Sequence, residues 1–541
     1  MDRASTIVKY VFFATTALLL MTMLAFPMGN DQAIFEVCGA LIVKKGAIPF
    51  RDFLEMKQPL IFYIYSLSTL LFGRHEWSIR LLDVLYHVVS LILYYKILRK
   101  VYKNEYIALV AILLYTVYFL SGGYWITAET ESFALLPQLG ILYSLIAAFE
   151  ATDKRQILGY AILAGACTIL VISIKITLGL IAIPVILSII FFSKRRPVGN
   201  STFFISFILS SVVFALFEIY WLWASKGLQN LILTFQWFSN YTSNYSPLFG
   251  IATFKDTYYK LVPAQFLVTF TPSLIALGIY AIAKHPISMK SEKNPSLLFF
   301  RFFCFLSVVF GVLGVLFERK AYTYHYTRLT WCLVPFVAEG FFEIWKARRR
   351  CFELVRQWSG FRRVIALSSL FTFFTVFILW SPLPRIVDQS LGWSLIALKN
   401  DSSARAKKIE SSKYDVADVI SLARKYAPTL SLQDNIFLWG NTAQLYYEFD
   451  KLPTTICIVN PQLISPWSPN EWTDTIVHQL TQAPPKYFFC ELKDERPLVS
   501  GTVDDSYTAL LKNSPLRDFL FVHYQLVDSN AHFRMYKYKS L

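Results

Sequence analysis

The feature that most constrains this chain is a series of apolar runs of about 20 residues, the length of helix that spans the hydrocarbon core of a bilayer. Charged residues make up only 16% of the sequence, whereas soluble domains carry about 25%. The apolar run at Leu60–Phe72 is shorter, so an interfacial or re-entrant helix is expected there. We therefore predict a polytopic α-helical membrane protein with about eleven transmembrane helices, over residues 7–28, 79–98, 106–121, 131–149, 157–173, 176–193, 202–224, 262–283, 297–317, 328–345 and 364–381.

Lysine and arginine gather in short segments between these runs, among them Lys194–Arg196 and Arg348–Arg350. Cytoplasmic loops of membrane proteins are enriched in these residues. This pattern predicts a multi-pass protein of the inner (plasma) membrane with a cytoplasmic N-terminus and an extracytoplasmic C-terminus. The net charge of +16 then reflects topology, and no nucleic acid partner is expected.

The composition changes after residue 382, which divides the chain into a predicted transmembrane catalytic domain, residues 1–382, and an extracytoplasmic domain, residues 383–541. The tail alternates helix-like and strand-like stretches, which is typical of a small α/β domain. Its cysteines, Cys457 and Cys490, could pair in an exported domain or remain free. The predicted helices and strands are Asp415–Tyr426, Glu471–Thr481, Asn435–Trp439, Thr455–Val459, Tyr487–Glu491 and Phe533–Tyr538.

The first outer loop, residues 29–78, is long and polar, and loops of this length are usually functional or disordered. Its first part has helical apolar spacing over Ala33–Val43, and Phe50 and Phe53 need a surface to cover. We therefore expect a packed loop that presents carboxylates and cations at a membrane face.

Ionisable residues accumulate on this predicted outer face. A charge within the membrane costs roughly 2.5–3.5 kcal/mol on insertion scales, so such groups are functional candidates. Cations can hold a lipid phosphate, and a carboxylate can take a proton from an acceptor hydroxyl. The residues that gather there are Asp31, Glu36, Glu55, Lys57, Arg80, Glu129, Glu131, Lys175, Glu318, Arg319, Lys320, His325 and Arg328.

Several of these residues also have a purely structural interpretation. Asp31 would serve as an N-cap, and Lys57 as an interfacial lysine whose amine reaches water. Glu129 and Glu131 would favour the N-terminus of the fourth span through the helix dipole. His325, among tyrosines, is typical of an aromatic belt.

The order of short motifs resembles the GT-C superfamily of membrane glycosyltransferases. More narrowly, it is similar to the family of the protein O-mannosyltransferases, the lipid A aminoarabinose transferase and the rhizobial core transferases. The resemblance covers about residues 1–345 and rests on Asp31 after the first span, GAIPFRDF at Gly46–Phe53, Lys57-Gln58-Pro59, Leu71–Gly73 with Arg80, Ala128-Glu129 with Glu131, Lys175, and His325-Tyr326 before Leu333-Val334-Pro335.

The resemblance implies a glycosyltransferase that moves a hexose or pentose from a polyprenyl-phosphate donor to a lipid, glycan or protein acceptor on the extracytoplasmic face, with inversion. It implies Asp31 as general base, with Glu129 and Glu131 as further catalytic candidates. The implied substrate-binding residues are Arg51, Asp52, Glu55, Lys57, Arg80, Lys175, His325, Tyr326 and Arg328.

The chain departs from the family pattern at Gln32, where an acid is often found, and at Gln58 in place of proline. These departures leave open whether a divalent metal ion takes part. Two alternative functions also remain, a polysaccharide polymerase or ligase and a lipid-linked-sugar transporter or flippase. No inverted repeat, which is typical of many transporters, is evident.

Overall fold

The computed structural model describes residues 3–192, 200–243, 294–318, 322–357, 360–379, 381–411 and 416–539, together with residues 275, 278 and 279. The chain separates into two compact units. Unit 1 comprises residues 1–26, 80–215 and 260–395, and unit 2 comprises residues 27–79, 216–259 and 396–541. The predicted division at residue 382 stays a prediction.

Unit 1 is helical. Its elements are α1 (Arg3–Met21), η1 (Thr22–Ala25), most of α4 (Glu76–Tyr102), α5 (Glu105–Ser121), η2 (Gly123–Trp125), α6 (Thr130–Phe133), α7 (Leu135–Glu150), α8 (Lys154–Ile174), η3 (Ile176–Ile181), α9 (Ala182–Phe192), the first part of α10 (Asn200–Ala224), α14 (Pro295–Glu318), η5 (Thr323–Leu329), α15 (Thr330–Gln357), α16 (Gly360–Leu379), α17 (Leu383–Ile386), η6 (Val387–Leu391) and most of α18 (Gly392–Leu398).

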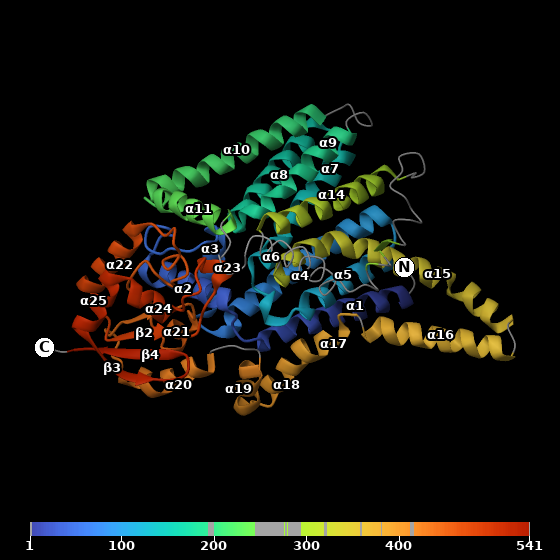
Figure 1. Ribbon diagram of the computed structural model, residues 1–541. Coiled ribbons are helices and arrows are strands. Elements are labelled where there is room, and N and C mark those ends of the chain that lie inside the picture. Colours follow the sequence, from blue (N-terminus) through green and yellow to red (C-terminus); the bar gives the residue numbers. More distant parts are fainter. Residues whose placement is uncertain are drawn as a thin grey trace. The chain divides into compact units, whose positions relative to one another are not determined.

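Within the described ranges, six helices are long and apolar enough to cross a bilayer, and three apolar helices are shorter. Helices α7, α8, α9 and α14 run side by side (Figure 1). Large apolar side chains such as Val89 and Leu209 remain exposed, as expected for surfaces that face lipid. The prediction of a multi-pass membrane protein is confirmed. The predicted span at residues 262–283 lies outside the described residues, apart from residues 275, 278 and 279.

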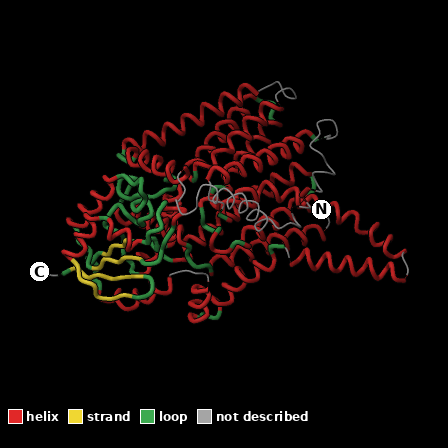
Figure 2. Tube along the Cα trace, viewed as in Figure 1, coloured by secondary structure: helices red, strands yellow, loops and turns green. Residues whose placement is uncertain are grey.

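Unit 2 contains a four-stranded sheet in the order β1-β2-β4-β3 (Figure 2). Strand β1 (Ile436–Trp439) pairs parallel with β2 (Tyr487–Glu491), and β4 (Phe533–Tyr538) lies antiparallel between β2 and β3 (Tyr524–Ser529). The surrounding helices are α19 (Ser402–Ser411), α20 (Val416–Tyr426), η7 (Ala427–Thr429), α21 (Gln444–Glu448), α22 (Asn470–Gln482), α23 (Pro497–Ser500), α24 (Ser506–Lys512) and α25 (Ser514–His523).

The predicted α/β tail is therefore confirmed, although one predicted strand is wrong and several helices and a strand were not predicted. Residues Thr455–Val459 form no strand, although Cys457 makes an isolated bridge to Leu54. The edge strand β3 was not predicted, because it is mostly exposed and its residues do not alternate between buried and exposed. Cys457 and Cys490 are free, buried thiols.

The first outer loop forms part of unit 2 and contains α2 (Asn30–Lys45) and α3 (Leu60–Phe72). The two helices pack closely because Gly39 has no side chain, and a Cβ atom there would collide with the α3 backbone. Leu54 from this loop and Trp237 from α11 (Leu228–Ser243) share one hydrophobic core with Phe437 of β1. The expectation of a packed loop is confirmed.

Candidate active site

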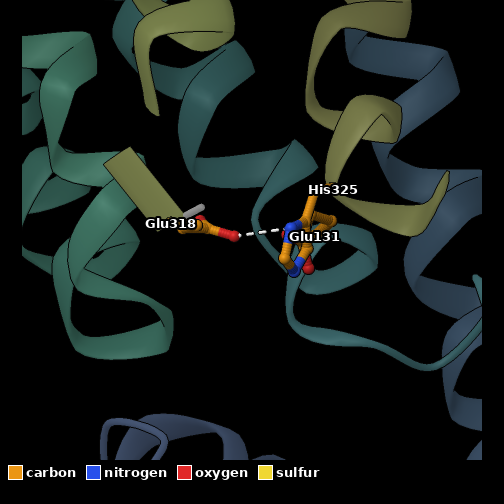
Figure 3. Close-up of side chains that lie close together, drawn as sticks. All are labelled: Glu131, Glu318 and His325. Carbon is orange, nitrogen blue, oxygen red and sulfur yellow. Dashed lines mark ion pairs between the residues drawn. The ribbon is translucent and has the colours of Figure 1, made fainter. Parts of the chain in front are cut away.

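Unit 1 contains a cluster of buried charges drawn from four elements. Glu131 comes from α6, Lys175 lies between α8 and η3, Glu318 ends α14, and His325 and Arg328 come from η5. All five side chains are less than a tenth exposed. Figure 3 shows the Glu318 carboxylate facing the His325 ring, with Glu131 beside them.

The two carboxylates of this cluster are shared between two cations. Glu131 Oε1 lies 2.7 Å from both Lys175 Nζ and Arg328 Nη2. Glu318 lies 2.6 Å from Arg328 and 3.2 Å from Lys175. Because the charges balance, neither cation is left uncompensated by the protein, which a buried charge requires.

The guanidinium of Arg328 nevertheless has spare donors. Within the described part of the chain, its buried Nε and Nη1 have no hydrogen-bond partner, and a side chain at Gly314 would lie 3.1 Å from Nη1. An unsatisfied buried donor costs free energy, about 1–3 kcal/mol and more for a charged group. These two N–H groups lie on different edges of the guanidinium, so each can donate a separate hydrogen bond to an anionic group such as a phosphate oxygen.

Three members of the cluster also form a set that could hold a metal ion. Ligand atoms of Glu131, Glu318 and His325 all lie within 4.8 Å of one another. Carboxylate oxygens and a neutral imidazole suit several divalent ions, and burial, against the opposing effect of Glu318, lowers the pKa of His325 to about 4. Lys175 and Arg328 already occupy the same carboxylates, so a metal ion would compete with both cations.

Side chains of helix α4 form hydrogen bonds to the loop that carries Glu129 and Glu131. Arg80, fully buried, donates to the carbonyl oxygen and the hydroxyl of Thr127 at 2.9 and 2.5 Å. Asp83 accepts from the Ala128 N–H at 2.7 Å and from the Ser132 hydroxyl at 2.6 Å. These bonds stabilise the left-handed backbone at Ala128, whose φ of 57° disfavours a residue with a side chain.

The second loop places its two acids differently. Glu129 is at the N-cap position of α6 and its side chain makes no capping hydrogen bond, so any stabilisation of this helix end by Glu129 comes through the helix dipole. Glu131 accepts from the Thr130 hydroxyl at 2.6 Å through Oε2, which leaves Oε1 for the two cations. Tyr326 is fully buried in η5.

Unit 2 contains a second group of predicted site residues, in the first outer loop. Asp31 Oδ2 lies 3.7 Å from Lys57 Nζ, and the Asp31 side chain is 37% exposed. The N-cap of α2 is Gly29, whose N–H donates to Gln32 at 2.7 Å, so Asp31 is not the N-cap. Glu55 is buried and accepts from the Met56 N–H, and burial raises its pKa to about 7 despite Lys57.

Arg51 and Asp52 form a turn in the same loop. Asp52 accepts from the Ile48 N–H at 2.7 Å and pairs with Arg51 at 2.6 Å. The hydrogen bond from Phe50 N–H to the Phe53 carbonyl and the positive φ of Phe50 complete the turn. These contacts show how the GAIPFRDF motif folds, and a substrate role for Arg51 and Asp52 stays a prediction.

The structure thus distributes the predicted residues over two groups. Unit 1 holds Arg80, Glu129, Glu131, Lys175, His325, Tyr326 and Arg328, and unit 2 holds Asp31, Arg51, Asp52, Glu55 and Lys57. Glu318 belongs to the predicted outer charges but not to the predicted site, and Asp83 belongs to neither. A signal existed for both, since each is an acid within or at the end of an apolar helix.

The chain resembles known proteins in part of its sequence and in its fold. Residues 56–223 match the family model described as dolichyl-phosphate-mannose-protein mannosyltransferase. No curated protein matches the chain in sequence. Among solved structures, the chain is similar to ArnT from Cupriavidus metallidurans bound to undecaprenyl phosphate, with a TM-score of 0.56 and 12% identity over 99% of this chain and 98% of that one.

The apo form of the same ArnT gives a TM-score of 0.55 at 12% identity, over 98% of each chain. The family model covers the part of the sequence from the first outer loop to α10, and the structural likeness covers almost the whole chain. The predicted resemblance is therefore confirmed: residues 56–223 match the mannosyltransferase family model, and the chain has the fold of ArnT.

Proposed function

We propose that this protein is a membrane glycosyltransferase that moves a sugar from a polyprenyl-phosphate donor to a lipid, glycan or protein acceptor on the extracytoplasmic face, with inversion at the anomeric carbon. The observation that carries the proposal is the buried Lys175–Arg328 pair, with two unsatisfied donors on Arg328, in a fold that ArnT shares. ArnT has been crystallised with undecaprenyl phosphate.

The cations of unit 1 give the donor phosphate its binding groups. Arg328 would donate from Nε or Nη1 to a phosphate oxygen, and Lys175 would add a second positive charge. Glu131 and Glu318 hold both side chains in place before the donor arrives. As the glycosidic bond breaks, charge grows on the leaving phosphate, and fixed donors stabilise that charge without reorganising.

The acceptor hydroxyl must lose a proton as it attacks the anomeric carbon. Asp31 is the proposed base because its carboxylate is part exposed and its paired cation, Lys57, lies at 3.7 Å rather than in tight contact. A base must be able to reach the acceptor proton, and a carboxylate of this exposure can.

Release of polyprenyl phosphate tests the proposal directly. The full chain in detergent and lipid would be mixed with a polyprenyl-phosphate sugar and cell-envelope membranes as the source of acceptor. We expect the sugar to appear in the membranes together with an equal amount of polyprenyl phosphate. Movement of the intact sugar lipid across vesicles, without its cleavage, would instead establish a transporter.

Metal dependence provides a second test. A divalent ion on Glu131, Glu318 and His325 would supply positive charge to the donor phosphate. Since Lys175 and Arg328 already provide that charge, we expect dialysis against a chelator to leave turnover within about twofold. Loss of activity that added Mg²⁺ or Mn²⁺ restores would show that the cluster works as a metal site.

The orientation proposed from the basic loops makes a third test possible. A reporter enzyme that is active only outside the cytoplasm, fused after Leu541, should be active because the tail is proposed to be extracytoplasmic. The same reporter fused after Lys103, in the loop between α4 and α5, should be inactive. The opposite pair of results on well-expressed fusions would reverse the topology.

A further inference from the structure

The carboxyl ends of the parallel strands β1 and β2 carry a polar cluster that the proposed function leaves without a role. Glu491, fully buried at the end of β2, accepts from the N–H groups of Asn441 and Thr442 at 2.6 and 2.9 Å and from the Thr442 hydroxyl at 2.6 Å. A side chain at Gly440 would lie 2.5 Å from the Glu491 carboxylate. The loop after β1 is therefore fixed to the end of β2.

Asn441 connects this loop to the first turn of α2. With its amide oxygen oriented toward the guanidinium, Asn441 contacts Arg496 at 2.5–2.6 Å and accepts from the Asn30 amide at 3.2 Å. Asn441 is only 4% exposed, so these bonds are largely shielded from water. Asn30 begins α2, and the next residue is Asp31.

Two other contacts hold α2 further along its length. Glu36 pairs with Arg74 at 2.7 Å, and Lys45 donates to the Pro453 carbonyl at 3.1 Å. The bond between Gly29 and Gln32 lies within the helix end itself and gives no attachment to the tail. At the end that carries Asp31, Asn441 and Arg496 attach the helix to the tail.

We propose that Arg496 is a positioning residue: through Asn441 and Asn30 it fixes the first turn of α2 and hence the direction of the Asp31 carboxylate. The inference rests on the proposed function, since it needs Asp31 as the base. A displacement of a catalytic group by about 1 Å can cost about 100-fold in rate. The tail thus sets the geometry of a base that lies more than 400 residues earlier in the sequence.

Steady-state kinetics of Arg496→Gln separate positioning from binding. We expect kcat to fall about 10- to 100-fold, with KM for the donor and for the acceptor membranes within about twofold. Arg496→Lys keeps the charge but not the planar fork, so it should recover part of the loss. Arg517→Gln, which removes an exposed arginine paired with Asp518 in the same unit, should behave as wild type.

A double-mutant cycle shows whether Arg496 acts through Asp31. In an Asp31→Asn background, Arg496→Gln should lower kcat by less than about threefold, because the group that it positions is already disabled. Multiplicative losses in the double variant would overturn the proposal, as would an unchanged kcat in Arg496→Gln. If Arg496→Gln does not fold, Arg496→Lys and Asn441→Ala replace it in the cycle.

Hydrogen exchange gives a result that does not depend on activity. Amides of residues 33–37 in α2 should exchange about 10-fold faster in Arg496→Gln, while those of α22 stay unchanged. Equal exchange at residues 33–37 would refute the positioning role even in an active enzyme. If the wild type releases no polyprenyl phosphate, the proposed function fails, and exchange still decides whether Arg496 fixes α2.

Discussion

Replacing Asp31 by Asn is expected to lower turnover by about 100-fold or more, the usual range for loss of a general base. Asn keeps the size of the side chain but cannot accept a proton at neutral pH. The variant should fold normally, because the N-cap of α2 is Gly29 and the ion pair with Lys57 is long and part exposed. Polyprenyl phosphate release with saturating donor and acceptor measures the effect.

A carboxylate paired with lysine elsewhere in unit 2 provides the control. Asp504 pairs with Lys512 at 2.6 Å in the tail, and Asp504→Asn should leave turnover unchanged. Turnover of Asp31→Asn within a few-fold of wild type would remove Asp31 from the mechanism. The search for the base would then move to Glu129 and Glu131.

The second large effect concerns Arg328. We expect Arg328→Lys to keep the fold, because a positive charge remains between Glu131 and Glu318, yet to lose about 100-fold or more in kcat/KM for the donor. A lysine cannot present the Nε and Nη1 donors that lack a protein partner. Arg328→Met should instead destabilise the protein by about 3–5 kcal/mol, because it removes one of the two cations that the buried carboxylates of Glu131 and Glu318 share.

A second buried arginine–glutamate pair offers a matched control for this substitution. Arg301 pairs with Glu339 and lies on α14, about 25 Å along the helix from Glu318 at 1.5 Å per residue. Arg301→Lys should retain donor kinetics while testing the tolerance of a buried pair to lysine. Equal kinetic losses in the two variants would assign Arg328 a structural role, and thermal unfolding separates that case from misfolding.

Much of the architecture follows from simple properties of the sequence. The length of the apolar runs indicates membrane helices, and the order of motifs from Asp31 to His325 indicates the fold family. The position of Lys175 between two helices was also predictable, because a single lysine interrupts an apolar stretch. These properties are local, and a sequence displays them without knowledge of tertiary contacts.

The partners of the charges were not predictable in the same way. Glu318, Lys175 and Glu131 come from helices far apart in the chain, and their pairing depends on how α14 packs against η3 and η5. The hydrogen bonds from Ala128 and Ser132 to Asp83 likewise join residues more than 40 positions apart, which no local pattern displays. An exposed edge strand such as β3 carries no apolar alternation, so its sequence does not identify it as a strand.

The shared hydrophobic core of unit 2 has a consequence for how such proteins can diverge. Leu54 of the first loop and Trp237 of α11 fill the same core as residues of β1 and β2, and Leu54 bridges to Cys457. If a relative's tail replaced this one, its core side chains would not match those of the first outer loop in size and shape. If acceptor preference changes among relatives of this protein, substitutions in the loop and in the tail should therefore occur together. Exchange of the tail alone by recombination would leave apolar side chains of both parts incompletely packed.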